Sequence, residues 1–515
     1  MKRLLAWVLT LALCLTFAAC SNEKEPYQPT GDGLTWEEGD GLTPTGIQEE
    51  PQQLSLTWYP EKTLNPYSCG DFTNQALLPL LYQGLFAMDR NYNLEPVLCQ
   101  SYRISADMTT YTFYPAKATF SDGSALTAED ILVSLQTAKE GSVYGGRLSR
   151  VKTMELSEDG GVVVTMDTAY ENLPILLDIP IVKSNSVLAE VPTGTGPYRM
   201  EGTGSGAILR RRTDWWCKAS MAVTADTISL MVAESSTQIR DTFQFRNLSL
   251  VCANPASDHY ADYRCDYELW DCENGDFLYL ACNMNSKVFS QAPLRAALPG
   301  VLDRESIAED NYRGFGRAAT LPASPLSPYY NQTLASRYSY DGGAAMKQAV
   351  VDAQLPADTV VQLLVNSDDS LRARVARTIA DALRDCGLTV ELLNLGTSQY
   401  KEYLRNGWYD LYLGQTRLSP NMDLSAFFSR YGALNYGDLY SAELYELCIQ
   451  SLANHGNFYT LHQTLLDDGR MCPILFSSYA IYATRGLLSE LTPSRCNVFY
   501  YTLGRTMENA LLKDE

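Results

Sequence analysis

The sequence predicts an α/β protein that is built from several lobes. The chain has 515 residues, which at about 100–200 residues per domain is enough for about two to four lobes. Hydrophobic residues make up 46% and charged residues 19%, a balance that is typical of a folded globular protein. A segment late in the chain, from about residue 359 to 393, has the pattern of a strand, a helix and a parallel strand, which indicates an α/β lobe.

The first nineteen residues have the organisation of a secretory signal peptide. Lys2 and Arg3 form a charged start, and an apolar run follows from Leu4 to Ala19. This run is short for a membrane span, and an uncleaved N-terminal anchor is the alternative. Small residues directly before Cys20 resemble the bacterial lipobox, which implies cleavage before Cys20 and attachment of lipid to it.

Residues 20–53 are predicted to be the lipidated cysteine and a flexible tether. They are rich in Pro, Gly, Thr and Glu and contain few apolar side chains. No later stretch of the sequence offers about eighteen uninterrupted apolar residues. We therefore expect the body to lie at the outer face of the cytoplasmic membrane, at the cell surface or in the periplasm, with lipid as its only membrane attachment.

The body is predicted to open with a strand, because apolar and polar side chains alternate from Leu54 to Tyr59. A turn at Leu64–Tyr67 and a helical apolar run at Gln75–Phe86 follow. Further along, Tyr111–Tyr114 is typical of a short strand and Ser121–Gly123 of a turn.

A helix is predicted to begin after Thr127. The Thr127 side chain can accept a hydrogen bond from the Asp130 amide, and acidic residues suit the positive end of a helix dipole. Ile131 and Leu135, four residues apart, would form the buried face.

The late α/β unit has the clearest pattern. Residues 359–365 predict a buried strand, and apolar residues recur every four positions from Leu371 to Leu383 on a helix that ends at Gly387. Residues 388–393 predict a parallel strand, and a helix at 397–405 and a strand at 409–413 follow. Ligands in such lobes bind beyond the carboxyl ends of the strands, so the loop after Leu413 is a candidate binding loop.

Asn274-Gly275 predicts the turn of a β-hairpin. It stands between two apolar segments, residues 267–270 and 277–280. Asn-Gly is a strong signal for a two-residue hairpin loop.

The composition excludes several classes of partner and chemistry. Because 40 Lys and Arg stand against 60 Asp and Glu, the net charge is −20, and nucleic acid and anionic lipid are poor partners. The three histidines, at 259, 455 and 462, do not have metal-site spacing, and no nucleophile–base pair or phosphate loop is present in the sequence. We therefore expect no metal, no cofactor and no catalytic residue, and we predict that the protein is not an enzyme.

The thirteen cysteines do not predict a disulfide framework. Cys14 would leave with the signal peptide and Cys20 would carry lipid, which leaves eleven, an odd number. Cys265 and Cys272, the closest pair, would lie about 23 Å apart along a strand, too far for a disulfide bond. Most of these thiols are expected to be ordinary buried side chains.

Six sequence blocks follow one another in order along the body. They are YQGLF with EPVL (82–86, 95–98), YTFY (111–114), FSDGSALTAED (120–130), GTGPY (194–198), LACN (280–283) and the segment 283–304, which contains LRAAL and Asp303-Arg304. Together they resemble the extracellular solute-binding proteins of peptide and nickel ABC importers, the oligopeptide/dipeptide-binding family. The resemblance runs from about residue 54 to 505, although any single block is weak.

This resemblance implies a periplasmic-binding-protein-like flytrap of mixed sheets and helices, with an extra third lobe. Lobe I would be discontinuous, at residues 54–83, 191–280 and 483–515, lobe II would span 84–190, and lobe III would span 281–482. The ligand would lie between lobes I and III, and the chain crossings near residues 280 and 483 would be the hinges. A ligand that contacts both lobes stabilises only the closed form, which drives closure.

The resemblance also implies the function and the partners. We expect a membrane-anchored, monomeric protein that captures a small solute, with short peptides as the expected ligand, and passes it to ABC permease and ATPase subunits encoded elsewhere. The alternatives are a surface receptor or sensor, and a non-peptide ligand such as an acidic metabolite, an oligosaccharide or a metal chelate.

The loop that would recognise a peptide amine departs from the family pattern. Peptide-binding members carry an Asp there, where this chain has Arg417-Leu418. Amine recognition would need Asp423, whereas Arg417 suits a carboxylate. The alternatives are that Asp423 caps a helix and that Arg417 faces solvent or pairs with a neighbouring acid. The candidate ligand-binding residues of this loop are Gln415, Thr416, Arg417, Ser419 and Asp423.

Five more candidates stand at positions where family members approach the ligand. Tyr67, Ser68 and Asp71 follow the first strand, and Tyr279 and Asn283 stand at the expected crossing. Turn formation is the alternative role for the first group, and core packing is the alternative for Tyr279.

Overall fold

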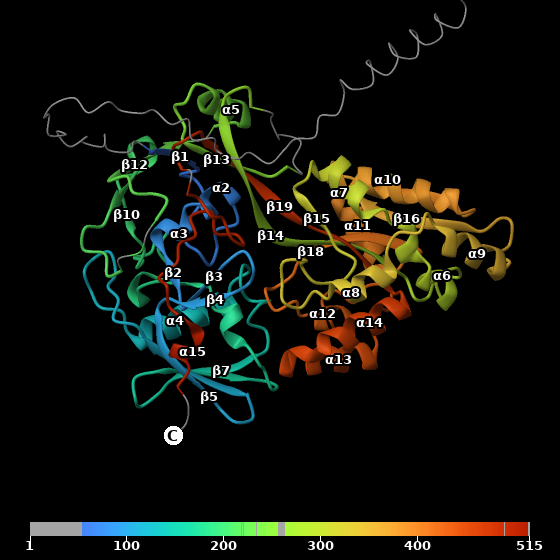
Figure 1. Ribbon diagram of the computed structural model, residues 1–515, viewed down its shortest axis with the longest axis horizontal. Coiled ribbons are helices and arrows are strands. Elements are labelled where there is room, and N and C mark those ends of the chain that lie inside the picture. Colours follow the sequence, from blue (N-terminus) through green and yellow to red (C-terminus); the bar gives the residue numbers. More distant parts are fainter. Residues whose placement is uncertain are drawn as a thin grey trace, which may run out of the picture. The chain divides into compact units, whose positions relative to one another are not determined.

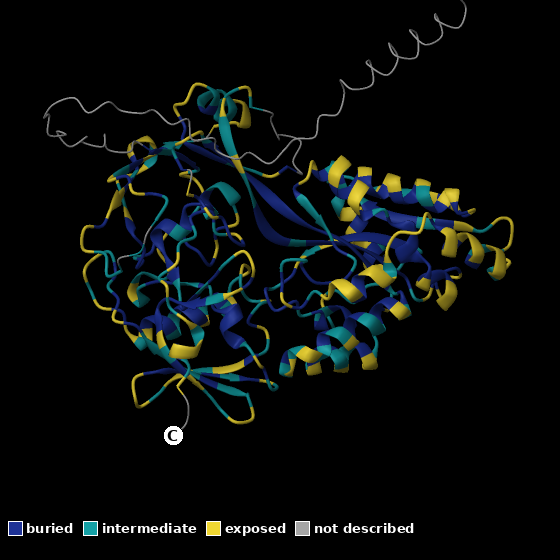
Figure 2. Ribbon diagram, viewed as in Figure 1, coloured by how far each residue is buried: buried dark blue, intermediate teal, exposed yellow. Residues whose placement is uncertain are grey.

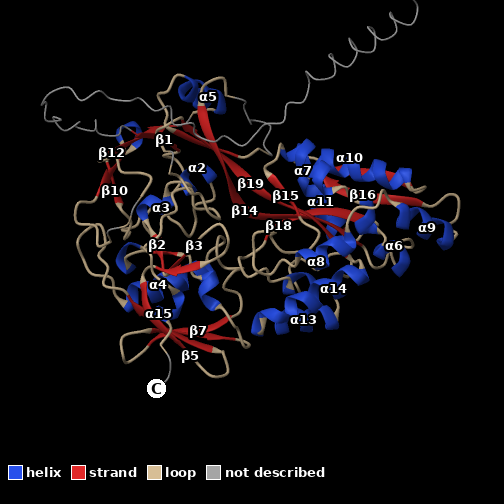
Figure 3. Cartoon of the chain, in the orientation of Figure 1, coloured by secondary structure: helices blue, strands red, loops and turns tan. Residues whose placement is uncertain are grey.

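Three β-sheets of four or more strands organise the body of the protein (Figures 1 and 3). The structure is a computed structural model that describes residues 54–217, 219, 221–232, 234–255, 263–488 and 490–512. The predicted signal peptide, Cys20 and the tether lie outside the described residues. Within the described residues, no helix has the length and the apolar character that crossing a membrane requires.

The first sheet has four strands in the order β1-β12-β11-β10. β1 is parallel to β12, and the other pairs are antiparallel. Leu54, Leu56 and Trp58 are buried, so the strand predicted from the alternation at 54–59 is confirmed. The bounds are β1 Leu54–Trp58, β10 Tyr198–Glu201, β11 Ile208–Arg211 and β12 Thr227–Val232.

The second sheet is antiparallel, with its four strands in the order β5-β6-β8-β7. The helix α4 (Ala128–Glu140) packs against it. Thr127 and Asp130 form a reciprocal capping box at its start, and Ile131 and Leu135 are buried, so this predicted helix is confirmed. The strands are β5 Cys99–Ile104, β6 Thr110–Pro115, β7 Val151–Leu156 and β8 Val162–Met166.

The third sheet has seven strands in the order β13-β19-β14-β18-β16-β17, and β15 pairs with β19. Its two long strands, β14 and β19, run side by side between the two groups of elements seen in Figure 1. β16 is parallel to both β17 and β18, which confirms the predicted α/β unit. The bounds are β13 Leu250–Ala253, β14 Tyr267–Cys282, β15 Gly316–Ala318, β16 Val360–Asn366, β17 Thr389–Leu395, β18 Leu411–Arg417 and β19 Met471–Thr484.

Helices cover both faces of this sheet. Leu363 and Leu413 pack into one core with α7, α9 and α10, whereas Leu364 and Tyr412 face a second core with α11 to α14. The exposed side of α10 is visible as a yellow stripe in Figure 2. The bounds are α6 Ala292–Ala296, α7 Arg304–Tyr312, α8 Gln332–Ala335, α9 Ala344–Ala353, α10 Ser370–Asp385, α11 Thr397–Asn406, α12 Ser425–Phe428, α13 Ala442–Ala453 and α14 Phe458–Asp468.

Shorter elements connect the sheets. β2 pairs with β9, and β3 pairs with β4. Their bounds and those of the remaining helices are α2 Phe72–Gln75, α3 Leu78–Leu81, β2 Gln83–Gly84, β3 Phe86–Met88, β4 Leu94–Pro96, η1 Leu173–Leu176, β9 Pro180–Ile181, η2 Ser184–Ser186, η3 Gly204–Gly206, α5 Ser236–Gln244, η4 Leu298–Val301, η5 Ser336–Tyr338, η6 His455–Asn457 and α15 Met507–Ala510.

The predicted helix at Gln75–Phe86 is wrong over its second half. The helix α3 ends at Leu81, and the chain continues as the strands β2 and β3. The Gly196 amide of the GTGPY block donates to the Leu81 carbonyl, and a Cβ at Gly194 or Gly196 would collide with that backbone. This close approach of two chain segments takes the Leu81 carbonyl out of a helical ladder, and helical periodicity alone does not reveal it.

The predicted hairpin at Asn274-Gly275 is also wrong. Both residues lie inside the single strand β14, which pairs with β19 on either side of them. The register of this pairing shifts between Glu273 and Phe277, and Gly275 has a φ of +76°. A glycine with positive φ serves a β-bulge as well as a hairpin turn, and here the long partner strand selects the bulge.

Candidate ligand-binding site

A cavity of about 600 Å³ is lined by residues from five parts of the chain. Volumes of about 300–1,000 Å³ are usual for small-molecule sites. The lining residues lie within the segments 66–97, 142–180, 416–434 and 494–501, together with Asn274. Segments that are far apart in the sequence therefore meet around one space.

One wall of the cavity is largely apolar. It is formed by side chains of α3, β3 and their neighbours, namely Leu78, Pro79, Tyr82, Phe86, Met88 and Val97. The lining from residues 416 to 425 is more polar, because Thr416, Ser419 and Ser425 contribute hydroxyl groups. Such a mixture suits a ligand that has both apolar and hydrogen-bonding groups.

Four of the charged side chains in the lining are held in ion pairs. Arg147 pairs with Asp178, and Asp423 accepts hydrogen bonds from Arg150 Nε, at 3.3 Å, and from the Ser425 amide, at 2.8 Å. Arg417 donates through Nε to Asp276, at 2.9 Å, and through Nη2 to the Tyr479 hydroxyl, at 3.2 Å. Burial opposes the charge on Arg417, but Asp276 and the other groups around it hold its pKa above the ordinary value.

Asn274 brings the β14 bulge to the edge of the cavity. Its side-chain oxygen accepts hydrogen bonds from the Asp276 amide, at 2.9 Å, and from the Ser477 hydroxyl of β19, at 3.0 Å. The carbonyl of Gly275 accepts a hydrogen bond from the Leu418 amide, at 3.0 Å. The bulge thus fixes the start of the loop 418–424 relative to the strand.

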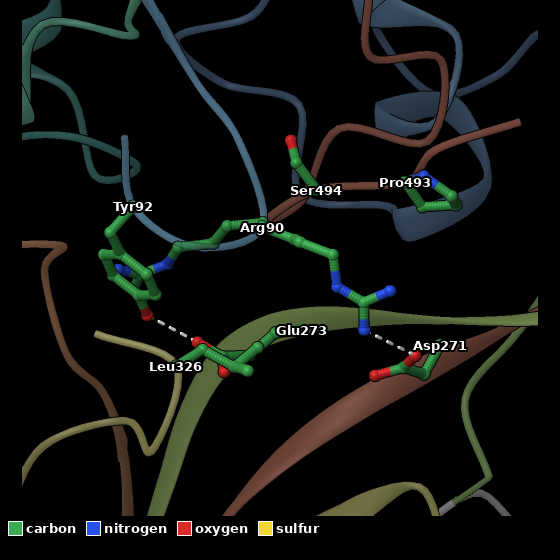
Figure 4. Close-up of a pocket in the computed structure, with 8 residues that line it drawn as sticks. Arg90, Tyr92, Asp271, Glu273, Leu326, Pro493 and Ser494 are labelled. Atoms are coloured by element: carbon green, nitrogen blue, oxygen red, sulfur yellow. Dashed lines mark hydrogen bonds and ion pairs between the residues drawn. The ribbon is translucent and has the colours of Figure 1, made fainter. Parts of the chain in front are cut away.

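A second cluster lies beside the cavity and shares its Ser494 and Arg495 (Figure 4). Glu273 on β14 accepts hydrogen bonds from the Tyr92 hydroxyl, at 2.5 Å, and from the Ser324 hydroxyl, at 2.6 Å. Asp271, also on β14, pairs with Arg90, at 3.2 Å, and with Arg317. Figure 4 shows Arg90 and Tyr92 pointing toward the two acidic side chains of the strand.

The structure places four of the candidate residues in the cavity lining. They are Thr416, Arg417, Ser419 and Asp423. β18 continues to Arg417, beyond the predicted end at 413, because β14 pairs with it as far as Asp276. The predicted binding loop therefore begins after Arg417 and lies at the cavity.

The structure places the other six candidate residues outside this lining, where most of them form hydrogen bonds or packing contacts that stabilise the local structure. The Tyr67 hydroxyl donates to the Pro180 carbonyl, Ser68 lies in a turn, and Asp71 caps the start of α2 and pairs with Lys62. Gln415 is exposed and donates to Asp276, at 3.4 Å. Tyr279 packs edge-on against Phe427, and the side-chain amide of Asn283 donates to the carbonyls of Gly407 and Tyr409.

Sequence reasoning missed Arg147, Asn274 and the segment Ser494–Asn497, all of which line the cavity. The Asn274-Gly275 dipeptide was a visible signal, although it predicts a turn and not a cavity wall. No local pattern distinguishes Arg495 from an exposed arginine, because its neighbours come from segments far away in the sequence.

The eleven cysteines of the described residues are free thiols, and no group of three or more His, Cys, Asp or Glu side chains among those residues is arranged to hold a metal ion. His259 lies outside the described residues, and His455 pairs with Glu171 at 3.5 Å.

Curated relatives of this chain are solute-binding proteins. The glutathione-binding protein GsiB of Escherichia coli (strain K12) is 21% identical over 361 residues, which are 65% of this chain and 68% of that protein. The protein of the same name from Pectobacterium atrosepticum is 23% identical over 363 residues, with the same shares of the two chains.

Solved structures show the same fold at low sequence identity. The ABC transporter substrate-binding protein CtaP of Listeria monocytogenes matches with a TM-score of 0.73 and 17% identity, over 89% of this chain and 100% of that chain. The oligopeptide-binding protein AppA of Bacillus subtilis, solved in complex with a nonapeptide, matches with a TM-score of 0.60 and 20% identity, over 85% and 95%. The predicted fold class, a flytrap of the periplasmic-binding-protein type with an extra lobe, is therefore confirmed.

The model of the bacterial extracellular solute-binding proteins, family 5, middle region, matches residues 93–437. This range covers more than half of the chain and contains five of the six sequence blocks in full and the first block in part. The chain belongs to family 5 of the bacterial extracellular solute-binding proteins, which bind their ligands without transforming them.

Proposed function

We propose that this protein is the capture component of an ABC importer and that it holds a short peptide in the cavity described above. The observation that carries the proposal is the cavity itself, which is lined both by the predicted lobes I and II and by the loop 416–434 of the predicted lobe III. The strands β14 and β19 join these parts and provide the hinge. Closure over a ligand that contacts both sides would bury it without any chemical step.

A free strand edge near the cavity supports an extended peptide as the ligand. β18 pairs with β14 through Arg417, but it pairs with β16 only through Leu411 and Tyr412. Among the described strands, none pairs with the other edge of β18 at Thr416 and Arg417. An extended backbone can bind such an edge through main-chain hydrogen bonds, while the apolar wall accepts its side chains.

The charges of the lining favour recognition of an acidic group over an amine. Asp178 and Asp423, the carboxylates of the lining, are already held by Arg147 and by Arg150 and the Ser425 amide. A peptide amine would have to displace an arginine from one of them, at the cost of leaving that arginine without its partner. An acidic metabolite is therefore the second candidate ligand, because it needs no free carboxylate on the protein.

We propose further that lipid on Cys20 anchors the protein at the outer face of the cytoplasmic membrane, where it works as a monomer with permease and ATPase subunits. This proposal rests on the lipobox-like residues before Cys20. In the native host, the wild type should partition into detergent and incorporate labelled palmitate. Cys20→Ser should lose both properties, and continued lipid labelling of this variant would contradict the anchor.

The function is tested by identifying what the protein carries. Native mass spectrometry of gently purified protein should show a bound species that denaturation releases and that fragments as a peptide. Free peptides of about two to five residues should then raise the midpoint of thermal unfolding, because a ligand that binds only the folded state stabilises it. If no peptide shifts the midpoint while an acidic metabolite does, the second candidate replaces the first.

A further inference from the structure

Arg495 is a buried cation with unused hydrogen-bonding capacity at the wall of the cavity. Arg495 is 7% exposed and lines the cavity, and its Nη1 atom has no hydrogen-bond partner. Within the described part of the chain, Arg495 forms no ion pair with an acidic side chain. A buried donor without a partner is costly, so an anion that reaches Nη1 gains a charge-assisted hydrogen bond.

The guanidinium of Arg495 is held in a fixed position. Nη2 donates to the Leu418 carbonyl, and Cζ lies 5.9 Å from the centre of the Tyr92 ring. It lies against Gly275, where any Cβ would collide with it. Because the group is already fixed by these contacts, it loses little freedom when it binds an anion.

The acidic side chain of Glu273, which lies in the same cluster as Arg495, is already engaged. Glu273 uses one carboxylate oxygen for the Tyr92 hydroxyl and the other for the Ser324 hydroxyl. Burial opposes the charge on Arg495, but Tyr92, Cys496 and Glu273 hold its pKa above the ordinary value, so the guanidinium is charged when it meets the ligand. Arg147 and Arg417, the other arginines of the lining, already have carboxylate partners.

The neighbours of Arg495 carry two more polar atoms without partners. The Ser494 hydroxyl and the Asn497 side-chain oxygen are buried, and neither forms a hydrogen bond within the described residues. Both residues line the same cavity. The hydroxyl can donate to an anion, and the amide oxygen can accept a hydrogen bond from a peptide N–H.

We propose that the segment Ser494–Asn497 is a carboxylate subsite, in which Arg495 Nη1 and the Ser494 hydroxyl bind the terminal carboxylate of the peptide ligand. This inference rests on the proposed function and adds the end of the peptide that is recognised. The carboxyl end of the peptide would then set the orientation of the ligand, because the carboxylates of the lining are already paired with arginines.

The test uses two series of probes that differ only in the recognised group. Alanine peptides of two to five residues are compared with their C-terminal amides by calorimetry on the full chain. The free acids should bind at least about tenfold more tightly than the amides, the scale of one charge-assisted hydrogen bond. Arg495→Gln should remove most of this preference, and Ser494→Ala should reduce it.

The ratio of the affinities for the free acid and the amide distinguishes ligand recognition by Arg495 from a purely structural role. If Arg495 only stabilises the bulge, Arg495→Gln will weaken both probes equally and leave the ratio unchanged, which overturns the inference. Arg103→Gln is the matched control, since the Arg103 guanidinium is exposed, pairs with Asp159 and does not line the cavity, and it should keep the ratio. Should Arg495→Gln not fold, the Ser494→Ala ratio decides.

The remaining outcomes separate the inference from the proposed function. Equal binding of acids and amides by the wild type overturns the subsite and leaves the peptide function intact. Absence of binding by either series at millimolar concentration overturns the peptide ligand and the subsite together.

Discussion

Buried arginines in this protein are held mainly by backbone carbonyls. The side chain of Arg212 is 0% exposed and donates to the carbonyls of Thr119, Phe120, Thr195 and Gly196. These carbonyls replace the water that would otherwise bind the guanidinium, so no second charged group has to be buried beside it. Two of the sequence blocks that identify the family, FSDG and GTGPY, are therefore joined by one side chain, and the carbonyls that it binds stabilise the fold.

His462 is a buried titratable side chain without such partners. It is 0% exposed, and neither of its ring nitrogens forms a hydrogen bond in the structure. Burial lowers the pKa of His462 from 6.5 to about 3. The unfolded chain takes up a proton as the pH falls through about 6.5, whereas the folded chain does not, so the contribution of His462 to stability is complete above that pH and is lost toward pH 3.

We predict that His462→Leu removes this pH dependence. Between pH 6 and pH 4, the free energy of unfolding of the wild type should fall relative to that of the variant by up to about 1.4 kcal/mol per pH unit. Urea unfolding of both proteins at several pH values measures the difference, in which the effects of the carboxylates and of His455 cancel. A difference that does not change with pH would show that His462 is protonated or hydrogen-bonded in the folded protein.

Whether a contact between two side chains can be predicted from the sequence depends on how far apart the partners are along the chain. Thr127 and Asp130 are three residues apart, and their capping box was predictable from local chemistry. Arg417 and Asp276 are 141 residues apart, and the contact of Arg495 with Leu418 spans 77 residues. Only the fold brings these groups together, so the position of the Arg495 guanidinium at the cavity could not be predicted.

At the scale of elements, hydrophobic periodicity predicts the α/β unit well. The strands β16 and β17 and the helix α10 lie within about one residue of the predicted ranges at most of their ends, because apolar positions alternate or recur every four residues. Asn274-Gly275 fails for a physical reason: its local signal is the same in a hairpin and in a bulge. The choice is made by β19, which lies about 200 residues later and pairs with both halves of β14.

The β14 bulge allows a sharp prediction about Gly275. Gly275→Ala should reduce the free energy of unfolding and weaken peptide binding, because alanine is strained at positive φ and its Cβ must displace the Arg495 guanidinium. The φ strain alone is worth about 1–2 kcal/mol. Denaturant unfolding and calorimetry measure the two effects.

Gly123→Ala is the matched control for Gly275→Ala. Gly123 has a φ of +85°, but a Cβ there meets nothing within 4 Å, so this variant carries the strain without a collision. It should be destabilised less than Gly275→Ala and should bind peptides as the wild type does. Equal effects of the two substitutions on stability and on binding would show that Arg495 is not held by the bulge.

At the scale of the whole molecule, β14 connects the parts that the proposed closure brings together. Its Glu273 accepts hydrogen bonds from Tyr92 and Ser324, which belong to the predicted lobes II and III. Glu273 is 5% exposed, and separating the lobes would take the Tyr92 and Ser324 hydroxyl groups away from its carboxylate. In the proposed closure, these two hydrogen bonds would favour the closed arrangement.

We predict that Tyr92→Phe weakens peptide binding. Tyr92 is not part of the cavity lining, so the substitution removes no group that could contact the ligand there. One hydrogen bond to a charged group is worth about 1.5–3 kcal/mol, so affinity should fall by roughly tenfold or more as the open state becomes populated. Small-angle scattering should show a larger radius of gyration for the ligand-free variant than for the ligand-free wild type, and saturating peptide should abolish that difference.

Tyr114→Phe tests whether the effect belongs to closure. The Tyr114 hydroxyl also donates to a carboxylate, that of Asp159, but this pair is exposed and lies within the predicted lobe II. The variant loses the same type of hydrogen bond without a contact between lobes, so its affinity and its scattering profile should match those of the wild type. If Tyr92→Phe also matches the wild type in both measurements, the Glu273 cluster does not stabilise the closed form, and closure must depend on the ligand alone.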